Sequence, residues 1–123
     1  VVRCVRALLA RSSGASGDAP VGRALRAIEE QPAHPWTVES LATHVGLSRA
    51  ALARRFAVQM GEPPLTYLTR WRLALAADLL LGSDQTLAMI ASQVGYANAF
   101  ALSAAFKRVH GESPRSYRRG HAA

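Results

Sequence analysis

The feature that most constrains the fold of this chain is an internal repeat. Residues 41–64 read "LATHVGLSRAALARRFAVQMGEPP", and residues 90–114 read "IASQVGYANAFALSAAFKRVHGESP". Twelve positions match over about 30 residues, at an offset of 49 up to the first glycine and of 50 after it. The matched pairs are Thr37 and Thr86, Leu41 and Ile90, Ala42 and Ala91, Val45 and Val94, Gly46 and Gly95, Ser48 and Asn98, Leu52 and Leu102, Phe56 and Phe106, Gly61 and Gly111, Glu62 and Glu112, Pro64 and Pro114, and Tyr67 and Tyr117. A match of this length indicates one supersecondary unit that the chain uses twice.

Each copy predicts two helices joined by a tight turn. Gly46 and Gly95 supply the turn dihedrals, and Ser48 and Asn98 are suited to cap the second helix. The apolar residues that hold the second helix against the first are four apart, Leu52 with Phe56 and Leu102 with Phe106. This is the pattern of a helix-turn-helix. One copy would fit an ordinary helical hairpin equally well, but two copies with basic residues facing outward favour DNA binding.

The segments around the repeat are also predicted to be helical. No stretch alternates with period two, so we expect an all-α fold. Residues 64–81 form the longest periodic segment, which predicts a central helix about 27 Å long between the two units. Residues 18–31 begin with Asp18 as an N-cap. Residues 1–11 space their apolar side chains as a helix does, and the "SSGASGD" that follows is typical of a flexible linker.

Composition excludes several classes of function. The net charge is +7, and Lys107 is the only lysine among 15 basic residues. Cys4 is the only cysteine, which leaves no disulfide framework or cysteine-based zinc site and fits a cytoplasmic location. No apolar run is long enough to span a membrane. The sequence has no catalytic triad, paired carboxylates or phosphate loop, and its four histidines lack ligand spacing. We therefore expect no enzyme activity, no metal and no cofactor.

The stretch "IASQVGYANAFALSAAFKRVHGESPRSYRR" resembles the signature of the AraC/XylS family of bacterial transcription regulators. The shared elements are I-A, V-G-Y, F-K-R, G-x-S-P and Y-R. The segment "VESLATHVGLSRAALARRFAVQMGEPPLTYLTRWRLALA" resembles the less distinctive first half, so the likeness covers about residues 20–119.

The resemblance implies an all-α domain with two helix-turn-helix subdomains joined by a long central helix. Such a domain binds consecutive major grooves of double-stranded DNA and adjusts transcription, with RNA polymerase as an expected partner. Activation and repression both remain open from the sequence. The resemblance also implies a separate domain for effector binding and dimerisation. Because the chain starts with Val, we expect a fragment: residues 1–17 are the end of that domain plus the linker, and residues 18–120 are the DNA-binding domain. Its helix-turn-helix units are expected at about 38–59 and 87–110.

The second helix of such a unit enters the major groove with its N-terminal turns toward the base edges. The positions expected to face the bases are Arg49, Ala50, Ala53 and Arg54 in the first unit and Ala99, Phe100, Ser103 and Ala104 in the second. Arg54 is suited to bidentate contact with guanine, although a solvated or phosphate-bound arginine is the alternative. The family often has an arginine where Ala104 stands, so the second helix is expected to read bases less directly. Phe100 either rests on a thymine methyl group or completes the core, and the core role is the one we expect.

Phosphate contacts are expected from helix N-termini and from basic side chains. The candidates are Thr37, Arg55, Asn98, Lys107, Arg108, Arg115 and Arg118. The basic side chains fall in two clusters, residues 48–72 and residues 107–119, each with a local charge of +4. Two clusters that flank a central helix fit two footprints on duplex DNA, bound by one copy of the chain.

Two other functions remain open. A basic helical module could bind an acidic protein instead, and strongly salt-dependent binding to duplex DNA would separate the two functions. An enzyme-linked copy of the domain, as in DNA alkylation-repair proteins, would need a cysteine cluster, which this sequence does not contain.

Overall fold

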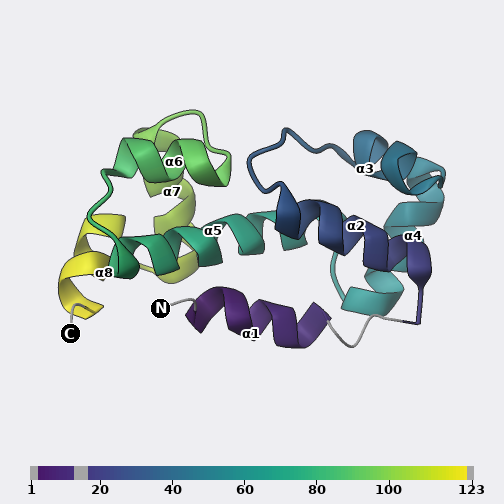
Figure 1. Ribbon diagram of the computed structural model, residues 1–123, viewed down its shortest axis with the longest axis horizontal. Coiled ribbons are helices and arrows are strands. Elements are labelled where there is room, and N and C mark those ends of the chain that lie inside the picture. Colours follow the sequence, from purple (N-terminus) through teal and green to yellow (C-terminus); the bar gives the residue numbers. More distant parts are fainter. Residues whose placement is uncertain (1–2, 13–16, 122–123) are drawn as a thin grey trace.

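Figure 1 shows the chain as a computed structural model, in which residues 3–12 and 17–121 are described. The regular structure in these residues is helical throughout, so the all-α prediction is confirmed. The helices are α1 (Arg3–Ser12), α2 (Ala19–Glu30), α3 (Val38–Val45), α4 (Arg49–Met60), α5 (Pro64–Gly82), α6 (Leu87–Val94), α7 (Ala99–His110) and α8 (Pro114–His121). The expected flexible linker lies mostly in residues 13–16, outside the described residues.

The polar residues expected at the helix starts do cap them. Thr37 Oγ1 accepts the N–H of Ser40 at 3.0 Å, and the Thr37 N–H donates to Ser40 Oγ at 2.8 Å, which is a capping box. Asn98 Oδ1 accepts a backbone N–H of α7 at 2.8 Å. Gly46 and Gly95 end α3 and α6 with φ of 78° and 105°, a region that glycine adopts without strain. Both turns therefore form where the repeat predicted them.

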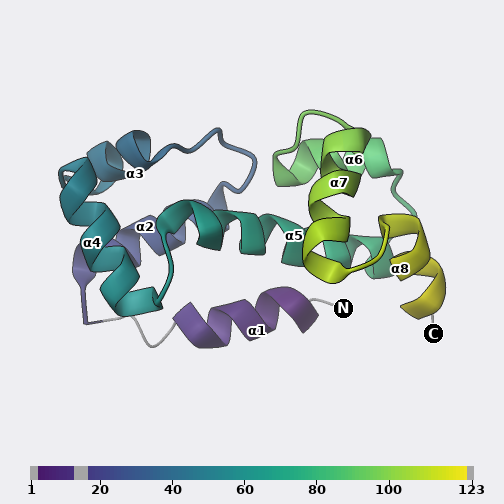
Figure 2. The same ribbon diagram turned by 180° about the vertical axis from the view of Figure 1, so that it is seen from behind.

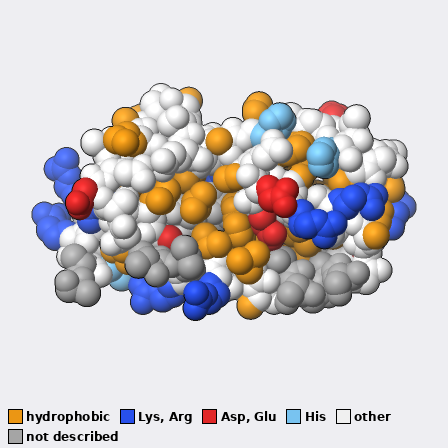
Figure 3. All heavy atoms as spheres, in the orientation of Figure 1, with side chains coloured by type: hydrophobic (Ala, Val, Ile, Leu, Met, Phe, Trp, Pro, Cys, Tyr) orange, Lys and Arg blue, Asp and Glu red, His pale blue; other side chains and the backbone are white. Residues whose placement is uncertain are grey.

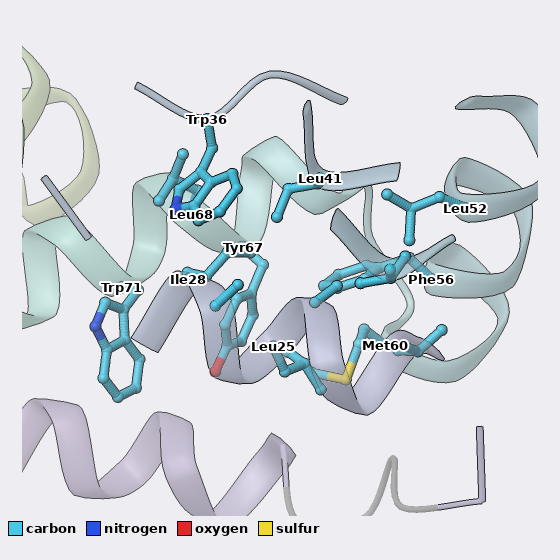
Figure 4. Close-up of a cluster of buried hydrophobic side chains, with 14 of the residues drawn as sticks. Leu25, Ile28, Trp36, Leu41, Leu52, Phe56, Met60, Tyr67, Leu68 and Trp71 are labelled. Atoms are coloured by element: carbon cyan, nitrogen blue, oxygen red, sulfur yellow. The ribbon is translucent and has the colours of Figure 1, made fainter. Parts of the chain in front are cut away.

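The repeat in the sequence is also a repeat of two packed cores. The first cluster gathers side chains from α2, α3, α4 and the first half of α5 (Figure 4). The second gathers side chains from the rest of α5 and from α6, α7 and α8. Leu52 and Phe56 in one unit, and Leu102 and Phe106 in the other, are fully buried. Each pair therefore fixes its helix against its own unit, as the four-residue spacing predicted.

Each unit contains a third helix that begins at a proline, α5 in the first unit and α8 in the second. The rings of Phe56 and Tyr67 lie edge to face with centroids 6.0 Å apart. The rings of Phe106 and Tyr117 repeat this arrangement with centroids 5.3 Å apart. Such tilted aromatic pairs are favoured by the charge distribution of the rings. The short α8 is thus the counterpart of the first turns of α5, and each repeat consists of three helices.

Helix α5 carries both units along its length. Helix α6 and the segment between α2 and α3 lie along one edge of α5, and α1 lies along the opposite edge (Figures 1 and 2). Leu8 of α1 belongs to the first cluster, and Cys4 packs against both clusters. The domain boundary expected at residue 18 therefore falls between two helices, α1 and α2, that both contact α5.

Candidate nucleic-acid interface

The second helix of each unit begins at the same edge of the molecule. Helices α4 and α7 start beside α3 and α6 and run toward the edge that α1 occupies (Figure 2). Helix α5 has 19 residues and is therefore about 28 Å long. Successive major grooves on one face of a duplex are about 34 Å apart. Two helices joined by such a spacer, with a modest bend of the DNA, have the geometry to reach neighbouring grooves.

Arg54 is the exposed cation of α4 that has no ion pair among the described residues. Ala50 is exposed and Ala53 is half-buried, so the surface around Arg54 on this helix is made of small side chains. Arg49 Nη1 lies 3.3 Å from Glu39 Oε2, with both side chains more than half exposed. An exposed pair of this kind contributes little to stability and can open when a phosphate group approaches.

The structure holds Arg55 within the first unit. Its Nε and Nη2 donate to the two carboxylate oxygens of Asp18 at 2.9 and 3.0 Å. Asp18 is also the N-cap of α2, so the pair ties α4 to the start of α2. The hydrogen bonds from Arg55 lower the pKa of Asp18 from its ordinary value. Because a bidentate carboxylate occupies the donors that a phosphate would need, Arg55 lacks the free guanidinium that was expected.

Most other cations of the first basic cluster are also paired. Arg70 Nε donates to Glu62 Oε1 at 2.7 Å. Arg72 donates to two backbone carbonyl oxygens in the segment between α2 and α3. In the described residues, Arg54 is thus the member of this cluster with neither an ion pair nor a carbonyl partner.

Phe100 on α7 does not join the core. Its side chain is 76% exposed, which makes the expected core role wrong. The physical reason is helical geometry: Leu102 and Phe106 define the buried face, and a residue two positions from Leu102 lies on nearly the opposite side. Ala104 is exposed as well, and Ala99 and Ser103 are half-buried.

Arg118 closes the C-terminal end of α5. Its Nε donates to the carbonyl oxygen of Leu80 at 2.7 Å, and its Nη2 donates to those of Ser83 at 3.1 Å and Gln85 at 2.9 Å. The last carbonyl groups of a helix lack partners inside the helix, so a guanidinium in this place satisfies them. Arg118, expected at phosphate, is therefore engaged within the second unit.

The remaining phosphate candidates are exposed. They are Thr37, Asn98, Lys107, Arg108 and Arg115. Thr86 was missed as a candidate, although the repeat pairs it with Thr37. Its Oγ1 accepts the N–H of Met89 at 3.2 Å at the start of α6, and its side chain is exposed. The alignment of the two copies was the signal that could have identified Thr86.

Charge is unevenly distributed over the surface. In the view of Figure 3, Lys and Arg side chains gather toward the two ends and the lower edge, with apolar and acidic side chains between them. Among the described residues, no group of three His, Cys, Asp or Glu side chains is placed to hold a metal ion. None of the described helices combines the length and the apolar character needed to cross a membrane.

Comparison with known sequences assigns the family. The family described as "Helix-turn-helix domain" matches residues 41–120. The chain is 49% identical over 102 residues to a putative AraC-like transcription regulator from Streptomyces lividans, covering 83% of this chain and 34% of that protein. The chain therefore spans about a third of the length of the curated relatives it matches.

Two solved structures share the arrangement of both units. The C-terminal domain of AraT, a response regulator from Geobacillus stearothermophilus, matches with a TM-score of 0.83 and 33% identity, over 86% of this chain and 88% of that one. The DNA-binding domain of AdpA, a global transcriptional factor solved in complex with a target DNA, matches with a TM-score of 0.79 and 31% identity, over 83% and 92%. The family and the fold are those of transcription regulators rather than of enzymes. This chain belongs to the AraC family of helix-turn-helix transcription regulators.

Proposed function

We propose that the chain is a sequence-specific DNA-binding domain of a bacterial transcription regulator, which places α4 and α7 in successive major grooves. The observation on which the proposal rests is the paired geometry: two units of the same architecture begin their second helices at the same edge of the molecule (Figure 2). The similar AdpA domain was solved with a target DNA, which supports the same kind of ligand here.

The two units contact the bases with different side chains. The positions that face base edges are Arg49, Ala50, Ala53 and Arg54 on α4, and Ala99, Phe100, Ser103 and Ala104 on α7. Arg54 reads a guanine through O6 and N7, because its guanidinium is exposed and has no ion pair among the described residues. Phe100 rests on a thymine methyl group, since its exposed ring has no role in the core.

Phosphate groups are held by helix N-termini and by exposed cations. The groups that bind them are Thr37, Thr86, Asn98, Lys107, Arg108 and Arg115. Arg55 and Arg118 are left out of this set, because both donate their hydrogen bonds inside the protein. Contacts of this kind position a protein on the duplex without reading its sequence.

The properties of the whole regulator belong to the same proposal. The chain covers about a third of its curated relatives, so further segments would supply effector binding and dimerisation. The regulator would act in the cytoplasm, where the bacterial chromosome lies, and would adjust transcription through contact with RNA polymerase.

Selection of bound duplexes from a random library tests the proposal, with the chain compared to its Arg54→Ala and Lys107→Ala variants. Arg54→Ala should lose about 1–3 kcal/mol on the preferred site and blur the preference at one base pair. Lys107→Ala should weaken binding to all sequences about equally, because a phosphate contact carries no base information.

Two results would count against the proposal. The absence of any enriched sequence with the unaltered chain would remove sequence-specific binding altogether. Strong preferences confined to the half-site under residues 98–108, retained in Arg54→Ala, would show that α7 rather than α4 reads the bases.

A further inference from the structure

The two units are separate packing bodies that meet on α5. The first cluster uses Tyr67, Leu68, Trp71 and Ala74 of this helix, and the second uses Leu73, Ala76, Ala77 and Leu80. Arg72 lies where these two sets meet, near the middle of α5. Because α5 runs through both bodies, bending at its middle is the motion that would change their separation. Any contact between the two units near the middle of α5 therefore restrains that bending.

Arg72 makes such a contact between the two units. Its Nε donates to the carbonyl oxygen of Pro32 at 2.8 Å, and its Nη2 donates to that of His34 at 3.0 Å. Both carbonyl groups belong to the segment between α2 and α3, in the first unit. The same guanidinium lies 5.9 Å from the ring centroid of Tyr96, in the turn of the second unit. Burial lowers the pKa of Arg72, against an opposing effect of Tyr96.

Gly95 brings the second unit into this contact. A Cβ atom at Gly95 would lie 2.7 Å from Arg72 Nε and 2.8 Å from the carbonyl oxygen of Pro32. A side chain there would have to push the guanidinium or the backbone of the first unit aside. Gly46 occupies the same position in the first unit, where an added Cβ would meet nothing within 4 Å. The absence of a side chain at Gly95 thus serves the contact between units as well as the turn.

The segment between α2 and α3 reaches toward α6 on one edge of α5, while α1 lies along the other edge (Figures 1 and 2). Bending of α5 in this plane would therefore have to open the Arg72 contact or disturb α1. Bending of α5 would change the distance and the angle between the starts of α4 and α7.

We propose that Arg72 and Gly95 form a clamp that fixes the separation of the two recognition helices and so determines which half-site spacing the domain accepts. This inference rests on the proposed function, and Arg72 acts in it as a positioning residue that does not touch DNA. One inserted base pair shifts a half-site by about 3.4 Å and rotates it by about 35°. A rigid pair of helices cannot follow such a change, whereas a pair with a free hinge can.

The test measures the affinity of the chain and of Arg72→Ala for duplexes with one or two base pairs inserted or removed between the selected half-sites. The unaltered chain should lose about tenfold or more per step, comparable to a mismatched base pair. Arg72→Ala should bind the preferred duplex more weakly and lose clearly less at each step. Equal dependence on spacing in the two proteins would overturn the clamp.

Arg23→Ala is the matched control. Arg23 Nη2 also donates to a backbone carbonyl oxygen, that of Val45 at 3.0 Å, but both residues belong to the first unit. This variant loses the same charge and a similar hydrogen bond, and its dependence on spacing should equal that of the unaltered chain. If Arg23→Ala broadens the accepted spacing as much as Arg72→Ala does, the clamp is refuted.

A second pair of variants covers the case in which Arg72→Ala does not fold. Gly95→Ala and Gly46→Ala both place a side chain at positive φ, but the added Cβ meets the clamp only at Gly95. Relaxed spacing in Gly95→Ala alone supports the clamp, and the same behaviour in both variants contradicts it.

Residual dipolar couplings of the DNA-free protein separate a failure of the clamp from a failure of the proposed function. Both units should align as one body in the unaltered chain and as two in Arg72→Ala. A single alignment in the variant overturns the clamp. An unaltered chain that aligns as one body but selects no DNA sequence leaves the clamp supported as a structural tie and refutes the proposed function and the spacing role.

Discussion

At the scale of residues, the two recognition helices share their buried positions and differ at their exposed ones. Arg54 of α4 corresponds to Ala104 of α7, and Ala50 corresponds to Phe100. At the first pair of positions α4 exposes a cation and α7 exposes a methyl group. At the second pair α4 exposes a methyl group and α7 exposes an aromatic ring. This difference would give each half-site its own chemistry, with hydrogen bonds at one and apolar contact at the other.

Substitution of the two phenylalanines of α7 should separate packing from exposure. Phe106→Ala is expected to lower the free energy of unfolding by about 3–5 kcal/mol, because its ring is fully buried. Phe100→Ala should change it by less than about 0.5 kcal/mol, since the exposed ring has few packing contacts to lose. Urea unfolding measures both values, and DNA titration of Phe100→Ala should show weaker binding. A decrease of more than about 2 kcal/mol in the free energy of unfolding of Phe100→Ala would show that this ring packs in the core.

The sequence predicted those residues whose role depends on local or periodic patterns. Caps such as Thr37 and turn glycines such as Gly46 are set by neighbours within a few positions. Arg55 and Arg118 were different, because their partners lie 37 and about 35 positions away along the chain. A charge count treats every arginine as free, and only the packed structure shows which guanidinium groups are already occupied.

At the scale of elements, α1 is held on α5 by a buried carboxylate. Asp78 is 6% exposed, and its Oδ1 and Oδ2 accept the backbone N–H groups of Cys4 and Val5, both at 3.1 Å. These N–H groups belong to the first turn of α1, where helix amides lack partners and a negative charge is favourable. The carboxylate of Asp78 and the first N–H groups of α1 are therefore hydrogen-bond partners. Both would lose their partner if α1 separated from α5.

Asp78→Asn should loosen α1, because the amide side chain has no charge and only one acceptor oxygen for the two N–H groups. A hydrogen bond to a charged group contributes about 1.5–3 kcal/mol, so amide hydrogen exchange across α1 should speed up by about tenfold or more. Asp84→Asn, in the exposed connection between α5 and α6, is the control and should leave exchange in α1 unchanged. Exchange in α1 that is insensitive to Asp78→Asn would mean that apolar packing alone holds the helix.

Elements were predicted well where the two copies supported each other. Helices α3, α4, α6 and α7 each have a cap, an apolar stripe and a glycine stop in the sequence, and all four form. The sequence did not reveal how α1 packs, because docking on Asp78 joins residues more than 70 positions apart. The role of α8 as the third helix of its unit also became clear only when its tyrosine was seen against Phe106.

At the scale of the whole molecule, the count of 15 basic residues overstates the number of cations that are available to bind DNA. Several arginines are held in ion pairs or by carbonyl groups: Arg11, Arg49, Arg55 and Arg70 in the first way, and Arg23, Arg72 and Arg118 in the second. These internal contacts also determine which parts of the surface have cations available to bind phosphate groups. The exposed cations expected at phosphate, Lys107, Arg108 and Arg115, all lie toward the C-terminal end of the chain.

The salt dependence of DNA binding should reveal which arginines are free. If the three cations assigned to phosphate groups bind them, a log–log plot of affinity against salt should have a slope of about −3. Arg115 is exposed, so Arg115→Ala should reduce the size of the slope by about 0.9. Arg118 is the matched comparison from the same helix: its three carbonyl contacts mean that Arg118→Ala should lower the melting temperature and leave the slope nearly unchanged. Fluorescence anisotropy between 50 and 200 mM salt, with a thermal melt of each variant, gives both readings. A drop in slope for Arg118→Ala equal to that for Arg115→Ala would show that the guanidinium of Arg118 leaves α5 to bind the duplex, and that the charges held inside the free protein are available to DNA after all.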